Sequence, residues 1–120
     1  MNILPVGNGI LFKSRLKKLY KQGKINIEYD IYGNKLTKQN VTDEHLICRC
    51  HGGTSDLSNI ALATKEANWK RGCQPIENFL TYGNLRRYLL YFKDVKLPNF
   101  DGNAYREGIR KTIKELIGDA

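Results

Sequence analysis

Residues 41–72 read VTDEHLICRCHGGTSDLSNIALATKEANWKRG and carry most of the side chains in this chain that suit acid–base or metal chemistry. An acidic residue and a histidine stand side by side at Glu44 and His45. Further residues follow in a fixed order: Gly52, Gly53, Asn59, Asn68, Lys70 and Arg71. The stretch is therefore the first candidate for a functional site.

The same stretch predicts two short strands and a helix. One strand leads into the Glu44–His45 pair, and the apolar residues 60–63 suit a second strand. A helix is expected over about 65–71, with Gly72 as its C-cap. Gly52 and Gly53 lie between the two strands and favour a tight loop there.

The joint spacing, E-H-x6-G-G-x5-N-x8-N-x2-R-G, resembles that of the HNH (ββα-metal) nuclease family. The resemblance implies an α+β fold with a small ββα-metal core, in which an Ω-loop joins a two-stranded antiparallel hairpin that a helix follows. Helices are expected on both sides of this core, which covers residues 41–72. We expect residues 1–120 to form a single HNH-like nuclease domain.

The resemblance also implies a role for each polar residue of the motif. His45 would be the general base, and its ordinary pKa suits that role near neutral pH. Glu44 and Asn68 would bind one divalent ion, and their oxygen donors favour Mg²⁺ or Mn²⁺. Asn59 would tie the loop so that the histidine keeps its orientation. Asp43 is a substitute ligand if the register differs by one residue.

Glu44 and His45 are neighbours in the chain, which restricts how they can act together. Adjacent residues of a regular strand point to opposite faces. The pair can therefore cooperate only at the end of a strand or at an irregularity, and the resemblance places it where the Ω-loop begins.

Many members of the family frame this core with a zinc ribbon of four cysteines. The matching positions here hold Tyr29, Tyr32, Thr64 and Ala67, which cannot form a tetrahedral zinc site. We therefore expect no structural zinc.

The cysteines of this chain are odd in number, which does not suit the disulfide framework of a secreted protein. Cys48 occupies the place of the family's usual proline, and Cys50 and Cys73 complete the set. Reduced thiols in a reducing compartment are the expectation, while a partial zinc site with His51 lacks a fourth ligand. His51 is also an alternative titrating group in the loop.

A formal net charge of +8 and an isoelectric point near 9.5 suggest a polyanionic partner. Lys70 and Arg71 are expected to contact phosphates, while Trp69 is expected in the core. A basic helix over 15–22 supplies further phosphate-binding candidates: Lys17, Lys18 and Lys21.

The flanking segments predict structure without chemistry. Residues 24–32 alternate between apolar and polar and indicate a strand, followed by a turn at Gly33. Amphipathic helices are expected over 84–93 and 104–117, the second capped by Asn103. A loop is expected over 94–101.

We interpret the chain as a metal-dependent HNH endonuclease that nicks or cuts DNA, most simply double-stranded DNA. No apolar run suits a membrane span, so a cytoplasmic location is expected, and family habit suggests a phage or mobile element. A homodimer would permit double-strand cutting, although no residue demands one. Two alternatives remain: a non-catalytic nucleic-acid-binding module on the same scaffold, and a phage-type factor that binds a host protein.

Overall fold

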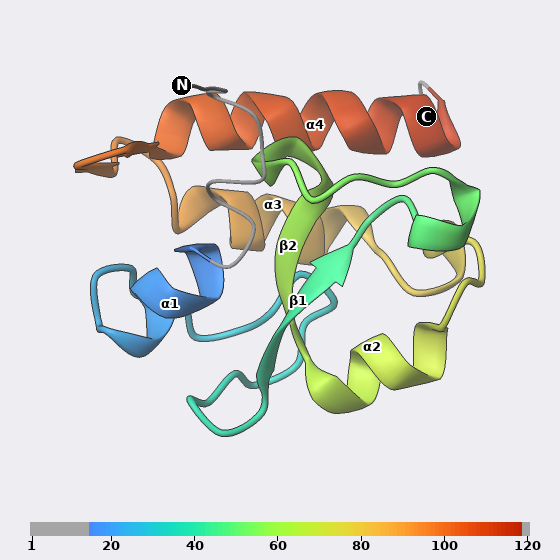
Figure 1. Cartoon of the computed structure of the whole chain (residues 1–120), viewed down its shortest axis with the longest axis horizontal. Coiled ribbons are helices and arrows are strands. Elements are labelled where there is room, and N and C mark those ends of the chain that lie inside the picture. Colours follow the sequence, from blue (N-terminus) through green and yellow to red (C-terminus); the bar gives the residue numbers. More distant parts are fainter. Residues whose placement is uncertain (1–14, 119–120) are drawn as a thin grey trace, which may run out of the picture.

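An antiparallel hairpin lies at the centre of the fold, with helices around it (Figure 1). The computed structural model describes residues 15–118. Strand β1 (Val41–His45) pairs with β2 (Ile60–Thr64) in a register that sets Val41 opposite Thr64 and His45 opposite Ile60. The expected α+β class and both strands of the hairpin are confirmed.

Residues 15–118 also contain four α-helices, three short 3₁₀ turns and a second pair of strands. The helices are α1 (Arg15–Lys21), α2 (Lys65–Arg71), α3 (Tyr82–Leu90) and α4 (Gly102–Ile117). The 3₁₀ turns are η2 (Arg49–His51), η3 (Leu57–Asn59) and η4 (Ile76–Asn78), and β3 (Lys96–Leu97) pairs with β4 (Phe100–Asp101). Within residues 15–118, no helix combines the length and apolar character needed to cross a bilayer.

Helix α2 follows β2 directly, and its ends explain its short length. The Thr64 hydroxyl accepts a hydrogen bond from the Ala67 amide and caps the N-terminus. Gly72 ends the helix with a φ of +54°, a conformation that glycine adopts without a Cβ penalty. The expected helix and its glycine cap are confirmed.

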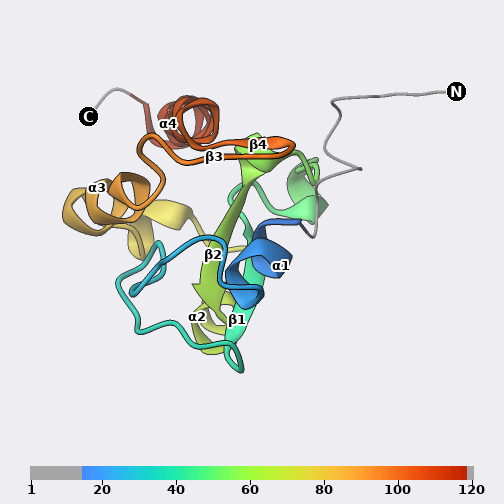
Figure 2. The same ribbon diagram turned by 90° about the vertical axis from the view of Figure 1, so that its left-hand side faces the viewer.

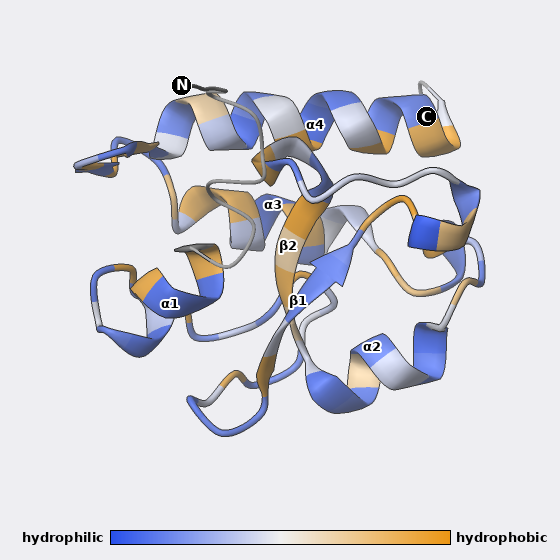
Figure 3. Ribbon diagram, in the orientation of Figure 1, coloured by the Kyte–Doolittle hydropathy of each residue, from blue (hydrophilic) through white to orange (hydrophobic). Residues whose placement is uncertain are grey.

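The two strands differ in their surroundings. Every residue of β2 is buried, whereas β1 mixes buried and half-buried residues. Figure 3 shows that much of β2 is hydrophobic and much of β1 hydrophilic. Helix α1 contacts β1, and Figure 2 shows α3 and α4 on the other side of the hairpin. An aromatic cluster of Tyr88, Phe92, Phe100 and Tyr105 fills the space between these two helices and β2.

The outer edge of β2 makes its hydrogen bonds without a neighbouring strand. The Tyr105 hydroxyl donates to the Ile60 carbonyl at 2.7 Å, and the Leu62 amide donates to the Tyr88 hydroxyl at 2.9 Å. The Thr64 amide donates to the buried Asp30 carboxylate at 2.7 Å. The Leu62 carbonyl accepts the Ile31 amide at 3.1 Å, so side chains from three segments and one backbone amide satisfy this edge.

The prediction of a strand over residues 24–32 was wrong. Only an isolated bridge between Tyr29 and Lys35 forms there. The alternation nevertheless reflects real burial, because Ile25, Ile27 and Ile31 are all in the core. The Ile31 amide donates to the Leu62 carbonyl of β2 at 3.1 Å without extending into a ladder, and the Asp30 side chain accepts the Tyr32 and Asn34 amides of the following turn.

The C-terminal predictions were correct in element type and shifted in their boundaries. Helix α3 begins at Tyr82 and ends at Leu90, and α4 begins at Gly102. Asp101, and not Asn103, caps α4 by accepting the amides of residues 103 and 104. The expected loop over 94–101 contains the short β3–β4 hairpin.

Candidate functional site

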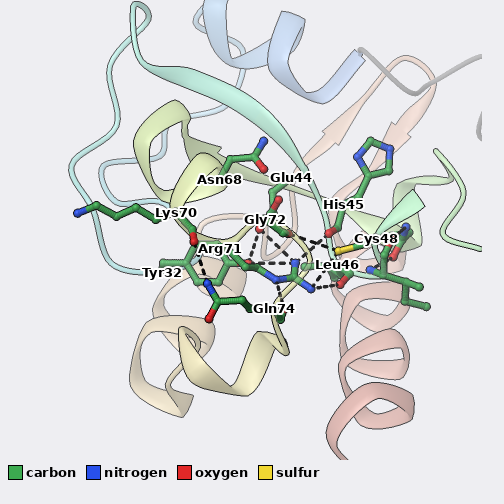
Figure 4. Close-up of polar contacts among 12 residues, drawn as sticks. Tyr32, Glu44, His45, Leu46, Cys48, Asn68, Lys70, Arg71, Gly72 and Gln74 are labelled. Atoms are coloured by element: carbon green, nitrogen blue, oxygen red, sulfur yellow. Dashed lines mark hydrogen bonds and ion pairs between the residues drawn. The ribbon is translucent and has the colours of Figure 1, made fainter. Parts of the chain in front are cut away.

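Glu44 is a buried carboxylate held from two directions. Its side chain is 3% exposed, and its Oε2 atom accepts the Tyr32 hydroxyl at 2.6 Å and pairs with Arg71 Nη1 at 3.2 Å (Figure 4). Burial raises the pKa of Glu44, while the Tyr32 hydrogen bond and the Arg71 charge oppose that rise. The residue expected to bind a metal ion is therefore engaged by a protein cation.

Arg71 fastens the end of α2 to the end of β1. Its Nη1 donates to the His45 carbonyl at 2.9 Å and its Nη2 donates to the Leu46 carbonyl at 2.7 Å. Its Nε donates to the Gln74 carbonyl at 3.0 Å, and the residue is 3% exposed. This burial contradicts the prediction that Arg71 contacts phosphates.

His45 is the last residue of β1, so it stands at the strand end that the sequence predicted. Its Nε2 lies 3.3 Å from the Ser55 hydroxyl across the loop. Partial burial, helped by the nearby charge of Arg49, lowers the pKa of His45 below its ordinary value of 6.5. The ring is therefore neutral at physiological pH and can accept a proton.

Asn59 ties the loop between the strands. The side chain is buried, its Oδ1 accepts the Ile47 amide at 2.8 Å, and its Nδ2 donates to the carbonyls of Ile47 (3.1 Å) and Thr54 (2.8 Å). The loop-tying geometry expected of Asn59 is confirmed. Its contribution to catalysis stays a prediction.

The two loop glycines are required for different reasons. Gly52 has a φ of +88°, which disfavours other residues. A Cβ added to Gly53 would lie 1.7 Å from the Ile47 carbonyl oxygen. The loop after His45 can close tightly because neither Gly52 nor Gly53 carries a side chain.

Asn68 points from α2 toward β1. Its Nδ2 donates to the Asp43 carbonyl at 3.3 Å, which places the amide beside the peptide that joins Asp43 to Glu44. Asn68 and Glu44 thus share the interface between α2 and β1. The His45 imidazole points away from the Glu44 carboxylate (Figure 4). The Asn68 amide therefore contacts the backbone of β1, the Glu44 carboxylate contacts Tyr32 and Arg71, and the His45 ring lies on the other side of the strand.

Asp43, the substitute ligand, is half-buried on the side of β1 that faces α1. Burial raises the pKa of Asp43 to about 6, and the nearby charge of Lys17 opposes this rise. Its Oδ1 atom is buried and finds no hydrogen-bond partner among residues 15–118. The side chain therefore carries an unsatisfied acceptor.

The donor types at the α2–β1 interface fit Mg²⁺ or Mn²⁺, since a carboxylate and an amide supply hard oxygen ligands. The charge at Glu44 fits less well, because Arg71 already neutralises it at 3.2 Å. A cation at Glu44 would therefore compete with the guanidinium of Arg71.

The remaining basic candidates lie at or near the surface. Lys18, Lys21 and Lys70 are exposed, and Lys17 is half-buried beside Asp43. Trp69 is 83% exposed, so the prediction that it belongs to the core was wrong. Its neighbours Asn68 and Arg71 turn toward β1, and this orientation leaves Trp69 facing solvent.

The partial zinc site considered from the sequence gains a member that the sequence did not indicate, because Cys73 joins Cys48 and Cys50. Cys73 follows α2, and its Sγ lies within 4.8 Å of those of Cys48 and Cys50 in the loop after β1. The sequence separation between the two segments hid this proximity. The substituted zinc-ribbon positions lie elsewhere, so the cluster is a separate candidate metal site.

Comparisons of this chain with protein-family models, with curated proteins and with solved structures gave no match.

Proposed function

We propose that this protein is a divalent-metal-dependent endonuclease that hydrolyses DNA phosphodiester bonds. The observation that carries the proposal is the position of His45 at the end of β1, followed by a loop that Asn59 ties and Gly53 closes. The succession of β1, the tied loop, β2 and α2 matches the order expected of a ββα-metal core. The proposal places the enzyme in the cytoplasm, where free cysteines persist.

His45 would accept the proton of the attacking water. A general base works best when its pKa lies near the working pH and its ring is unprotonated. Partial burial supplies the unprotonated form, and the Ser55 hydroxyl at 3.3 Å orients the ring. The tied loop limits the movement of the ring relative to a bound phosphate.

Glu44 and Asn68 would hold the divalent ion at the α2–β1 interface, and the His45 ring, which points away from the Glu44 carboxylate, would have to turn toward the ion. The ion would supply the positive charge that stabilises the pentavalent phosphate and the leaving oxygen. Arg71 pairs with Glu44 at 3.2 Å, so the ion would have to displace the guanidinium from the carboxylate in order to bind there.

DNA would lie along the exposed side of α2. Trp69 and Lys70 are adjacent and exposed there, and an exposed indole can stack on a base or insert at a base step. Lys18 and Lys21 of α1 add exposed positive charge. Lys18, Lys21 and Lys70 would make the phosphate contacts that were first expected of Arg71.

The test is incubation with supercoiled plasmid in Mg²⁺, Mn²⁺ or EDTA. We expect relaxed or linear product with the wild-type protein in metal and no product in EDTA or with His45→Ala. A folded His45→Ala protein that cuts as fast as the wild type would refute the role of His45.

Arg49→Ala is the companion variant. It removes a charge that lowers the pKa of His45 without removing the imidazole. Cleavage should persist, and the acid limb of its pH–rate profile should move to higher pH.

A non-catalytic nucleic-acid-binding module is the second candidate. The Glu44–Arg71 ion pair favours it, because the pair neutralises the expected metal ligand with a protein cation. This alternative would be established by a folded protein that binds DNA in a salt-sensitive manner and does not cleave it in the presence of any divalent ion tested.

A further inference from the structure

Three cysteine side chains meet where the loop after β1 approaches the end of α2. Cys48 and Cys50 stand on either side of Arg49, and Cys73 comes from the segment after α2. The three Sγ atoms lie within 4.8 Å of one another, and those of Cys50 and Cys73 are 2.8 Å apart. Cys48 is buried, while the other two cysteines are exposed.

We propose that Cys48, Cys50 and Cys73 bind one thiophilic divalent ion, with Zn²⁺ as the natural occupant. A tetrahedral zinc thiolate site has Zn–S bonds of about 2.3 Å, which separates its sulfur atoms by roughly 3.8 Å. This separation lies between the 2.8 Å that separates the sulfur atoms of Cys50 and Cys73 and the 4.8 Å within which all three sulfur atoms lie. Each thiol that ligates the ion releases its proton to solvent.

His51 is the fourth ligand in this proposal. It belongs to the same 3₁₀ turn as Cys50 and lines a cleft of about 290 Å³ together with Cys48 and Cys73. Its ring is exposed and lies outside the sulfur cluster, so it reaches the ion by rotating about its side-chain bonds. The resulting Cys₃His set is a common form of closed structural zinc site.

Arg71 supports the charge of such a site. Its Nη2 lies 3.9 Å from the Cys48 sulfur, and the Cys48 thiol donates to the Gly72 carbonyl at 3.4 Å. Three thiolates and one Zn²⁺ carry a net negative charge, which the buried guanidinium offsets.

The ion would join the loop after β1 to the end of α2. Arg71 stands between this cluster and Glu44, so the ion would fix the same contacts that position Glu44. The proposal depends only on the cysteines and His51, and it does not require nuclease activity.

The test uses the full chain, reduced and stripped of metal with a chelator, and then titrated with Co²⁺. We expect saturation at one ion per chain, with thiolate-to-cobalt charge-transfer bands and the d–d bands of a tetrahedral site. Added Zn²⁺ should abolish these bands and raise the melting temperature of the protein.

Cys73→Ser is the decisive variant, because Cys73 is exposed and its replacement leaves the core intact. Gln74→Ala, at the adjacent exposed position, is the matched control. Cys73→Ser should lose the charge-transfer intensity and the zinc-induced rise in melting temperature, and Gln74→Ala should keep both. His51→Ala should weaken Co²⁺ binding and shift the d–d bands.

A reduced wild-type chain that takes up no Co²⁺ would overturn the proposal, even if Cys50 and Cys73 form a disulfide in air. Equal Co²⁺ spectra for the wild type and Cys73→Ser would also overturn it. Unchanged affinity and d–d bands in His51→Ala would remove His51 from the ligand set.

Discussion

Arg71 Nη1 lies 3.2 Å from Glu44 Oε2, and both side chains are 3% exposed. The pair joins the last residue of α2 to the residue before the end of β1. A buried charge that loses its partner destabilises a protein strongly, whereas the net gain from an intact buried pair is small. Removing either partner leaves a buried charge unpaired, and the other hydrogen bonds of each residue decide which loss costs more.

We expect Arg71→Ala to lower the free energy of unfolding by about 3–5 kcal/mol. The substitution leaves Glu44 buried without its cation and also removes the donors to the carbonyls of His45 and Leu46. Glu44→Gln should cost less, because the amide oxygen still accepts from Tyr32. Urea denaturation of both variants and the double variant measures the coupling. A cost below about 1 kcal/mol for Arg71→Ala would contradict the buried pairing.

Asp43 gives a prediction for pH. Its pKa is raised from 3.8 to about 6 in the folded protein, so the folded state binds more protons than the unfolded state between these values. The stability linked to Asp43 is therefore fully present below pH 3.8 and is lost as the pH rises through about 6. We expect Asp43→Asn to abolish this loss.

At neutral pH, Asp43→Asn should stabilise the protein by about 1–2 kcal/mol, a value reduced for the partial exposure of the carboxylate. The advantage should shrink toward pH 4. Thermal unfolding in EDTA across this range measures it without a bound metal. A difference that stays constant with pH would show that Asp43 is not the titrating group.

Gly53 and Gly83 form a matched pair for substitution by alanine. A Cβ at Gly53 would meet the Ile47 carbonyl at 1.7 Å, whereas a Cβ at Gly83, in the first turn of α3, would meet nothing within 4 Å. We expect Gly53→Ala to destabilise by more than about 2 kcal/mol. Gly83→Ala should be neutral or stabilise by about 0.5 kcal/mol. Chemical denaturation distinguishes the two, and similar values would contradict the close approach at Gly53.

Trp69 gives a prediction for nucleic-acid binding. The side chain is 83% exposed, so Trp69→Ala should leave the melting temperature unchanged. The loss of base stacking should weaken binding to DNA about tenfold or more. The control is Tyr82→Ala, which removes an exposed aromatic side chain from a different helix, α3. This variant should bind DNA normally. Equal affinity of Trp69→Ala and wild type in fluorescence anisotropy would place the DNA elsewhere.

Local patterns predicted the two strands and α2, and the family resemblance implied the loop-tying asparagine. The Thr64 cap, the Gly72 stop and the contacts of Asn59 depend on residues near in the sequence or on one fixed spacing. The strand over 24–32 failed because alternation reports burial and not pairing. Ile27 is buried there, while the hydrogen bonds go to the turn formed by Asp30.

The site itself depended on contacts that a sequence does not display. Arg71 is 27 residues from Glu44 and Cys73 is 23 residues from Cys50, and only the packing of α2 against β1 brings each pair together. The exposure of Trp69 follows from the same packing. A seven-residue helix has too few turns to reveal its buried face from apolar spacing.

The satisfied outer edge of β2 limits how two copies of this chain can associate. The hydroxyls of Tyr88 and Tyr105 and the carboxylate of Asp30 occupy the backbone groups that an incoming strand would need. On the other side of the hairpin, Asn68 and Arg71 occupy carbonyls of β1. These contacts therefore disfavour extension of the β1–β2 hairpin by a strand from a second copy.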